Sequence, residues 1–308
     1  MLLSSSQAAC VPDSLIERFD HRFVEAWRRP GMQGIDLKKF SDDLVYRDGI
    51  WFSKSEGDVS YPKEGHGVLF QIEDKSYWFL HRSSCIIETM RKYSPGGIFF
   101  ELGGGNGYVS KCIQNGGYDV VLLEPSIDGI KNAKRRGVVN VICSTFEQAH
   151  VKRNSIPAIG IFDVLEHMPD DTRFLMNLRE IIIRNGRLYI TAPAHNFLWS
   201  REDVFAGHFR RYTLTRLCAL LQHAGFDIEY ATYFFSPLVL PIFLLRTIPH
   251  ALGVRRRITV KRAKRELILD KGFIRSALDV LLSRELATIR NGRSIACGSS
   301  CLIVVRAA

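Results

Sequence analysis

The sequence has few cysteines and no long uninterrupted apolar run, and these absences exclude several classes of protein. Its seven cysteines in 308 residues form no CxxC pair, and Cys297 and Cys301 have no histidine pair nearby. We therefore expect neither a disulfide scaffold nor a zinc site, and we predict no bound metal. Residues 1–10 lack a basic segment and a long apolar stretch, which argues against a secretory signal and favours the reducing cytoplasm.

Acidic residues are missing from one window of the chain. Eight Lys and Arg residues lie between Arg246 and Arg265 without any Asp or Glu, which accounts for +8 of the net charge of +10. A nucleic-acid-binding protein usually carries a broader basic surface with aromatic residues for base stacking, so we expect no nucleic-acid partner.

An apolar stretch at 233–245 directly precedes the basic window and is interrupted by Pro237 and Pro241. It is too short and too interrupted for a transmembrane helix. Apolar residues beside clustered Lys and Arg are typical of a peripheral membrane contact, which residues 233–265 would make. An oligomer interface, or a core helix with a solvated basic face, is the alternative, and the oligomeric state stays open.

Short apolar runs alternate with helical periods through the middle of the chain. With 46% apolar residues, the chain can bury a large core. We predict strands at 98–102, 120–124, 138–143, 158–162, 187–192, 226–235 and 301–305, and helices at 15–27, 78–93, 108–115, 125–136, 174–184 and 214–224. This alternation predicts a doubly wound, mostly parallel α/β sheet with helices on both faces. Residues 48–75 are expected to form loops and short hairpins.

The chain is expected to divide into three parts. Residues 1–94 form an N-terminal extension or cap, and residues 95–235 form the core. Residues 236–308 form an apolar and basic helical segment that also supplies the last core strand.

A glycine-rich loop, Glu101-Leu102-Gly103-Gly104-Gly105-Asn106-Gly107, follows the strand predicted at 98–102 and opens a helix. Glycines allow a tight turn and a close approach to a ligand. Glu101 would repel the pyrophosphate that dinucleotide loops attract to a helix N-terminus, and would attract an amine instead. Glu124, at the end of the next strand, can accept both hydroxyls of a ribose. Together they indicate a nucleoside without phosphates and with an amino-acid-like tail, which describes S-adenosylmethionine.

Over residues 95–235 the sequence resembles the class I S-adenosylmethionine-dependent methyltransferases. Residues 101–107 resemble the first motif of that family and residues 121–124 the second, while Asp163-Val164-Leu165-Glu166-His167 resembles the fourth-strand motif of its small-molecule branch. The resemblance implies a seven-stranded Rossmann-like sheet with an antiparallel last strand. It also implies cofactor contacts from Glu101, Gly103, Gly105, Asn106, Gly107, Glu124, Pro125, Thr145, Phe146 and Asp163. Arg82 lies just before the first strand, where a helix can cover the cofactor, and is expected to pair with the methionine carboxylate.

The family's reaction is an in-line SN2 transfer of a methyl group from a sulfonium to a nucleophile. Residues 207–212 resemble a subset of these enzymes that are uncharacterised or tied to envelope saccharide metabolism. A small or lipid-linked acceptor, such as a saccharide or isoprenoid-type hydroxyl, is therefore expected. A nicotinamide-dependent oxidoreductase on a similar sheet and a non-catalytic nucleoside-binding module are the alternatives.

Three histidines are candidates for the general base, because an imidazole titrates near neutral pH. His167 and His195 follow the fourth and fifth strands, and His208 lies in a long aromatic and charged connection. A purely structural role is the alternative for each. The predicted substrate-binding residues are Trp78, Arg210, Arg211 and Tyr212. A salt-bridged lid around the arginines, and an aromatic helix face around Trp78, are the corresponding alternatives.

Overall fold

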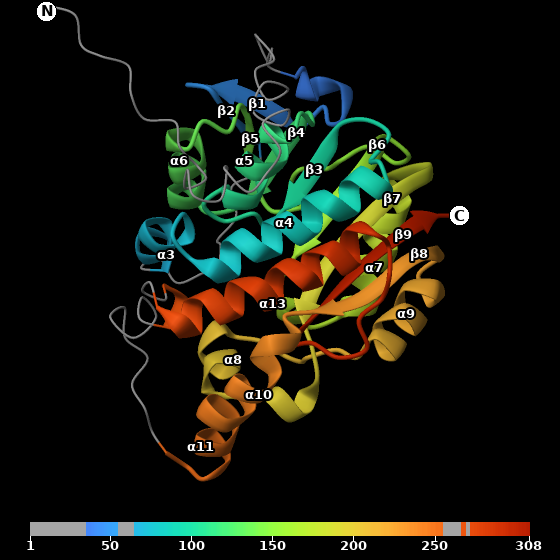
Figure 1. The fold of residues 1–308 in the computed structure, drawn as a ribbon. Helices are drawn as coiled ribbons and strands as arrows, with labels where there is room; N and C mark the ends of the chain where they lie inside the picture. The colour runs from blue at the N-terminus through green and yellow to red at the C-terminus, as the bar shows by residue number, and fades with distance from the viewer. Residues whose placement is uncertain (1–34, 55–64, 255–265, 269–271) are drawn as a thin grey trace, which may run out of the picture.

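The computed structural model describes residues 35–54, 65–254, 266–268 and 272–308. These residues form a nine-stranded sheet in the order β1-β2-β5-β4-β3-β6-β7-β9-β8. Figure 1 shows the sheet covered by helices on both faces. The helix expected at 15–27 and most of the basic window, 255–265, lie outside the described residues.

Seven strands make up the predicted core, and the α/β doubly wound arrangement is confirmed. The parallel strands are β3 (Phe99–Leu102), β4 (Val120–Glu124), β5 (Asn140–Cys143), β6 (Ile156–Phe162) and β7 (Ile182–Pro193). The last strand, β9 (Ser300–Ala307), lies antiparallel between β7 and β8 (Phe226–Phe234). Strands β3 and β4 are buried along their whole length, as the continuous apolar runs predict for a sheet covered on both faces.

The sheet has two strands more than the seven predicted, because a hairpin extends it. β1 (Leu44–Arg47) and β2 (Ile50–Ser53) pair antiparallel, and β2 adds in parallel to β5. Asp48 and Gly49 turn the chain with φ of 49° and 81°, as a two-residue hairpin turn requires. The Asp-Gly turn is visible in the sequence, but the docking of the hairpin on β5 depends on contacts with residues about ninety positions further along the chain.

Alternate residues of the central strands feed two hydrophobic clusters, one on each face of the sheet. Phe100, Val121 and Leu123 pack against α7 (Asp171–Ile181) and α9 (Leu214–His223). The opposite face packs against α4 (Tyr77–Lys92), α5 (Tyr108–Asn115), α6 (Ile127–Arg135) and α13 (Phe273–Arg290). Helices α4 and α13 lie side by side across this face (Figure 1).

A buried carboxylate fastens α13 to the rest of this face. Glu285 accepts hydrogen bonds from the backbone amides of Phe235 and Ser236, at 2.6 and 2.8 Å. Its Oε1 also lies 2.8 Å from His81 Nε2 of α4. The exit of β8 and the two helices are therefore held by one side chain.

The prediction that residues 48–75 contain only loops and hairpins was wrong. Helix α3 (Gly65–Glu73) forms there and docks beside α6. Arg136 pairs with Glu73, donates to the Phe70 carbonyl at 3.1 Å, and lies 4.4 Å from the Phe70 ring centroid. The helix therefore depends on tertiary contacts that its own sequence, with two glycines in its first turn, does not predict.

Short, interrupted helices form one end of the molecule: α8 (Arg201–Ala206), α10 (Val239–Ile242), the π-helical turn η5 (Phe243–Thr247) and α11 (Ile248–Ala251). Pro237, Pro241 and Pro249 lie at the helix starts or within a short helix, and so limit the length of each. Among the described residues, no helix combines the length and the apolar character needed to span a bilayer.

Candidate functional site

The glycine loop joins β3 to α5 at the carboxyl edge of the sheet. Gly103, Gly105 and Gly107 have φ of 70°, 56° and 72°, in the left-handed region that favours glycine. A Cβ on Gly107 would lie 2.6 Å from the Ala133 Cβ, and one on Gly104 would lie 2.4 Å from Leu122 Cδ1. The loop therefore needs glycine both for its backbone conformation and for its packing.

Glu124 ends β4 directly beside this loop. One carboxylate oxygen accepts a hydrogen bond from the Gly105 amide at 2.9 Å, and the other accepts from the Ser126 amide at 2.9 Å. The side chain is almost fully buried. The second carboxylate of the predicted pair thus fixes the glycine loop.

Glu101 lies beneath the loop. It is 1% exposed and accepts a hydrogen bond from the Ser110 hydroxyl of α5. Burial raises the pKa of Glu101 to about 7, although Ser110 and the charge of Arg82 act in the opposite direction. Because its pKa lies near physiological pH, the Glu101 carboxyl can readily lose its proton when a cation approaches it.

Asn106 belongs to the support of the loop. Its amide nitrogen donates to Glu73 at 3.1 Å, and its amide oxygen accepts from Asn132 at 2.9 Å. Arg136 binds its carbonyl at 3.1 Å. Because the side chain is committed to α3 and α6, a cofactor contact at this position would come from the backbone.

Pro125, Thr145 and Phe146 follow β4 and β5 at the same edge. The Ser144 amide donates to the Glu124 carbonyl at 3.3 Å, which keeps the two strand exits together. Phe146 is half-buried and packs edge-on against Phe174, with ring centroids 5.9 Å apart. Thr145 Oγ1 accepts from the Gln148 amide at 3.2 Å.

Arg82 and Asp163, both predicted cofactor contacts, pair with each other. Arg82 extends from α4 to the Asp163 carboxylate and lies 4.5 Å from the Trp78 ring centroid. Asp163 follows β6 with a positive φ of 56° and accepts from the Thr191 hydroxyl at 3.1 Å. Trp78 stacks on Phe235 at 5.6 Å, which corresponds to the aromatic helix face given as its alternative.

Glu166, His167 and His208 form a second polar cluster. The two imidazole rings are perpendicular, with centroids 4.8 Å apart, and Glu166 Oε1 lies 3.9 Å from His208 Nε2. Glu166 is completely buried, and neither of its carboxylate oxygens accepts a hydrogen bond within the described structure. Burial and the neighbouring His208 lower the pKa of His167 to about 4, while burial and Asp163 raise that of Glu166.

Sequence reasoning selected His167 and His208 separately and left Glu166 out of the site. The available signal was the Leu-Glu-His triplet after β6. The backbone brings the histidines together, because the Phe209 amide donates to the Glu166 carbonyl at 2.8 Å.

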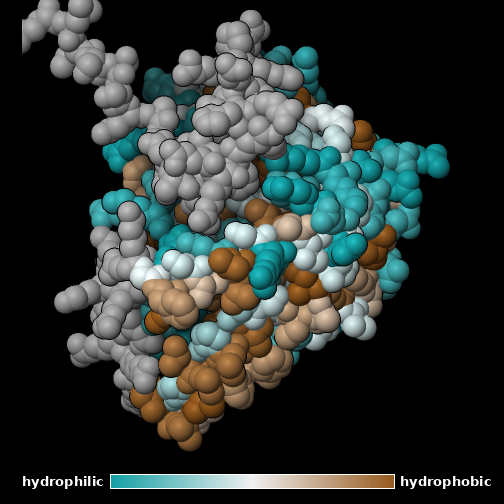
Figure 2. All heavy atoms as spheres, viewed as in Figure 1, coloured by the Kyte–Doolittle hydropathy of each residue, from teal (hydrophilic) through white to brown (hydrophobic). Residues whose placement is uncertain are grey.

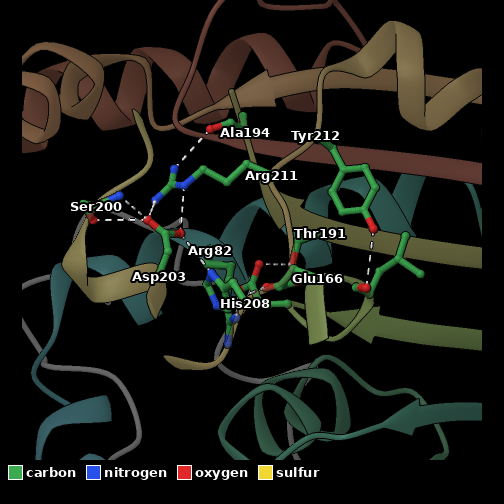
Figure 3. Close-up of polar contacts among 11 residues, drawn as sticks. Arg82, Glu166, Thr191, Ala194, Ser200, Asp203, His208, Arg211 and Tyr212 are labelled. Carbon is green, nitrogen blue, oxygen red and sulfur yellow. Dashed lines mark hydrogen bonds and ion pairs between the residues drawn. The ribbon is translucent and has the colours of Figure 1, made fainter. Parts of the chain in front are cut away.

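The predicted substrate-binding arginines have internal partners instead. Arg211 donates two hydrogen bonds to Asp203, at 2.8 and 3.0 Å. Arg210 pairs with Asp171 at 2.6 Å, and the buried Tyr212 hydroxyl donates to the same carboxylate at 2.9 Å. Figure 3 shows the Arg211–Asp203 pair with His208, Glu166 and Arg82 gathered beside it. These contacts are those of the salt-bridged lid.

Asp203 is the centre of that lid and was not predicted from the sequence. It also accepts from the Ser200 amide at 2.8 Å and contacts His208 Nδ1 at 2.9 Å. Burial would raise the pKa of Asp203, but the hydrogen bonds from His208 and Arg211 lower it to about 2.

The contacts of His195 differ from those of His167 and His208. It has a positive φ of 59°, and its ring stacks on Phe197 and Tyr233 at 5.1 and 4.7 Å. Its Nε2 is buried without a hydrogen-bond partner in the described part of the chain, and burial lowers the pKa of the ring.

A doubly wound sheet in this strand order, with a glycine loop after its first core strand and a carboxylate after its second, defines a nucleoside-binding Rossmann-like protein. A family model described as a methyltransferase domain matches residues 86–231. The family model, together with the relatives and solved structures that follow, supports a class I S-adenosylmethionine-dependent methyltransferase domain over residues 86–231, with S-adenosylmethionine as its cofactor.

Two relatives are named probable S-adenosylmethionine-dependent methyltransferases. The protein from Mycolicibacterium smegmatis is 21% identical over 171 residues, which span 54% of this chain and 66% of the relative. The protein from Mycobacterium tuberculosis is 22% identical over 177 residues, spanning 56% of this chain and 64% of the relative. The chain therefore matches slightly less than two thirds of the length of these relatives.

Solved structures show the same fold. A phosphoethanolamine N-methyltransferase 2 from Haemonchus contortus, in complex with S-adenosyl-L-methionine, superposes with a TM-score of 0.50 and 15% identity. The match covers 83% of this chain and 61% of that protein, and at this identity it supports the fold alone.

Proposed function

We propose that this protein transfers a methyl group from S-adenosylmethionine to a hydroxyl of a small or lipid-linked acceptor, such as a saccharide or an isoprenoid-type alcohol. One observation carries the proposal. The turn after β6 bears Asp163 next to the cofactor side and, three positions later, the buried Glu166, followed by the half-buried His167, whose ring faces His208. A cofactor site thus adjoins groups able to accept a proton from a hydroxyl.

The residues of the cofactor site and the proton-accepting residues beside it have separate tasks. The glycine loop and Glu124 would hold the nucleoside. Arg82 would orient either the amino-acid end of the cofactor or the Asp163 carboxylate. The cluster of Glu166, His167 and His208 offers groups able to take the proton of the acceptor hydroxyl. When bound, S-adenosylmethionine supplies the methyl group and leaves as its thioether. Orientation of the two reactants can contribute about 7–11 kcal/mol.

An exposed apolar face supports a lipid-linked acceptor. Large apolar side chains are exposed on α8, α10 and η5, directly after α11, and at the start of α13: Val204, Phe205, Leu240, Leu244, Leu245, Leu252, Phe273 and Ile274. Figure 2 shows apolar residues gathered at the end of the molecule that carries α10 and α11. This apolar end would contact the acyl or prenyl part of an acceptor or the membrane that holds it.

The apolar end adjoins the acceptor side of the site and the basic window. Phe197 lies 5.1 Å from His195 and 6.1 Å from Phe243, measured between ring centroids. Arg246 pairs with Glu266 at 2.8 Å, so the described residues flanking the basic window meet at this end. Seven Lys and Arg residues between 255 and 265 would complement an anionic lipid surface.

Transfer of labelled methyl groups tests the reaction. Protein incubated with labelled S-adenosylmethionine and a cell extract should label material in the saccharide or lipid fraction. Label found only in RNA or protein would refute the proposed acceptor. Calorimetry should show binding of S-adenosylhomocysteine but not of NAD. Binding without transfer to any fraction would favour the non-catalytic nucleoside-binding module.

Vesicle sedimentation tests the membrane contact separately. The protein should sediment with anionic phosphatidylglycerol vesicles more than with phosphatidylcholine vesicles, and added salt should weaken the binding. Leu245→Glu, at a side chain that is 62% exposed, should lower vesicle affinity about tenfold. Tyr46→Glu on β1, where the side chain is 59% exposed at the opposite sheet edge, is the matched control and should have no effect. Equal loss in both variants would contradict a specific apolar face.

A further inference from the structure

We infer that Glu166, His167 and His208 form a binding site for a divalent transition-metal cation. Their candidate ligand atoms all lie within 4.8 Å of one another. They come from two distant parts of the chain, the 3₁₀ turn after β6 (Leu165–His167) and the connection before α9, which the Phe209–Glu166 backbone hydrogen bond joins. This inference revises the expectation from the sequence that no metal is bound.

The buried Glu166 carboxyl lacks a partner for its ionised form within the described residues. It is fully buried, and neither oxygen accepts a hydrogen bond within the described residues. Arg82 and Arg211 carry the positive charges that act on Glu166. Each is already paired with another carboxylate, Arg82 with Asp163 and Arg211 with Asp203. An uncompensated carboxylate in such a place is costly, and a bound cation would remove that cost.

His208 is oriented as a metal ligand would be. Its Nδ1 lies 2.9 Å from Asp203 Oδ1, which fixes the ring, and Nε2 is the nitrogen directed to Glu166, at 3.9 Å from Oε1. A carboxylate that holds the far nitrogen of an imidazole is a common support of metal-binding histidines. Arg211 and Ser200 in turn hold Asp203 in place.

The donor set selects the kind of metal. Two imidazoles and one carboxylate suit Zn²⁺, Mn²⁺, Fe²⁺ or Co²⁺, whereas Mg²⁺ and Ca²⁺ prefer oxygen ligands alone. Metal–ligand bonds of about 2.0–2.2 Å would require these atoms to approach to roughly 3–3.5 Å, which is a small side-chain rotation from their present separation.

Three protein ligands leave coordination positions open for an acceptor. In the proposed reaction, on which this role depends, an acceptor hydroxyl bound to the cation would lose its proton more readily and present its oxygen to the methyl group. The proton would pass to water or to a neighbouring base, and the ion would keep its oxidation state. Asp163, three residues before Glu166, places the ion next to the cofactor side.

Cobalt titration of the whole, chelator-treated protein tests the site without cofactor or acceptor. Wild type should bind about one Co²⁺ per chain with visible d–d absorption, and Zn²⁺ should displace it. Glu166→Gln and His208→Gln should each weaken Co²⁺ binding at least about tenfold. His223→Ala, at an exposed histidine on α9, is the control and should bind as wild type does.

Thermal melting resolves the case in which a variant folds poorly. Co²⁺ should raise the melting temperature of wild type and of His223→Ala but not that of Glu166→Gln, which keeps the shape of the side chain. No stoichiometric binding, or unchanged binding by a folded Glu166→Gln, would overturn the metal site. Because S-adenosylhomocysteine binding is measured separately on chelated protein, failure of the metal site leaves the methyl-transfer proposal standing.

Discussion

Replacement of Glu101 by Gln should change the pH dependence of folding stability in a defined way. The native carboxyl has a pKa of about 7 because it is buried beneath the glycine loop, whereas an unfolded Glu titrates near 4.5. Between these values the folded state binds more protons than the unfolded state, so the contribution of Glu101 to stability is greatest below pH 4.5 and is lost as the pH rises through 7. The Gln side chain does not titrate, so Glu101→Gln should abolish this part of the dependence of the unfolding free energy on pH.

The magnitude follows from the size of the shift. A difference of about 2.5 pKa units corresponds to about 3 kcal/mol. Because a Gln amide oxygen can still accept from Ser110, the variant should match wild type near pH 4.5 and exceed its free energy of unfolding by up to about 3 kcal/mol at pH 8. The charges of Arg82 and Glu124 act on the Glu101 carboxylate and are already included in its pKa of about 7, whereas the Gln side chain is neutral at every pH.

Urea denaturation at pH 5, 6, 7 and 8 measures this difference directly. A stability difference that is constant across these pH values would refute the account of Glu101. The same residue tests the cofactor site, because an ammonium group near Glu101 favours its ionised form. Binding of S-adenosylhomocysteine at pH 7 should release up to about half a proton, measured by calorimetry in buffers of different ionisation enthalpy, and Glu101→Gln should release less.

Three further replacements test other parts of the site. Gly107→Ala should cost about 2–4 kcal/mol of unfolding free energy in urea melts, because φ is positive and the Ala133 Cβ lies 2.6 Å away, whereas Gly117→Ala, with open space around it, should cost only about 1–2 kcal/mol. Glu124→Ala should weaken S-adenosylhomocysteine binding by about 1–3 kcal/mol in calorimetry, and an unchanged affinity would remove it from the ribose contact. Asp203→Asn should cost about 3–5 kcal/mol because it leaves Arg211 buried without its charge partner; a cost below 1 kcal/mol would contradict that pairing.

The sequence predicted the elements whose cause is local. Helix α5 and strand β4 begin and end where expected, because a glycine loop, a continuous apolar run and a terminal Gly-Gly pair delimit them. The hairpin 44–53 and helix α3 were missed or underestimated, because each is stabilised by residues far along the chain. For α3 that residue is Arg136, which neutralises Glu73 and covers Phe70.

The site was predictable to the same extent. Spacing alone singled out the glycine loop and Glu124, and the structure brings the two together at the carboxyl edge of the sheet. The arginines at 210 and 211 were identified as a charged cluster, but a guanidinium that is buried needs a counter-charge, and spacing alone does not reveal which acid supplies it. Asp171 and Asp203 are those acids, and they turn the expected substrate grip into an internal brace.

The turn after β6 sets the distance between the two halves of the site. Asp163 takes a left-handed backbone conformation, which ends the strand abruptly and directs its carboxylate to Arg82 and Thr191. The 3₁₀ turn that follows, Leu165–His167, then buries Glu166 on the lid side. Because the two carboxylates are only three positions apart in the sequence, a group bound to Glu166 and one bound near Asp163 must lie within reach of each other. An in-line reaction requires such fixed proximity, which a flexible connection at this point would not supply.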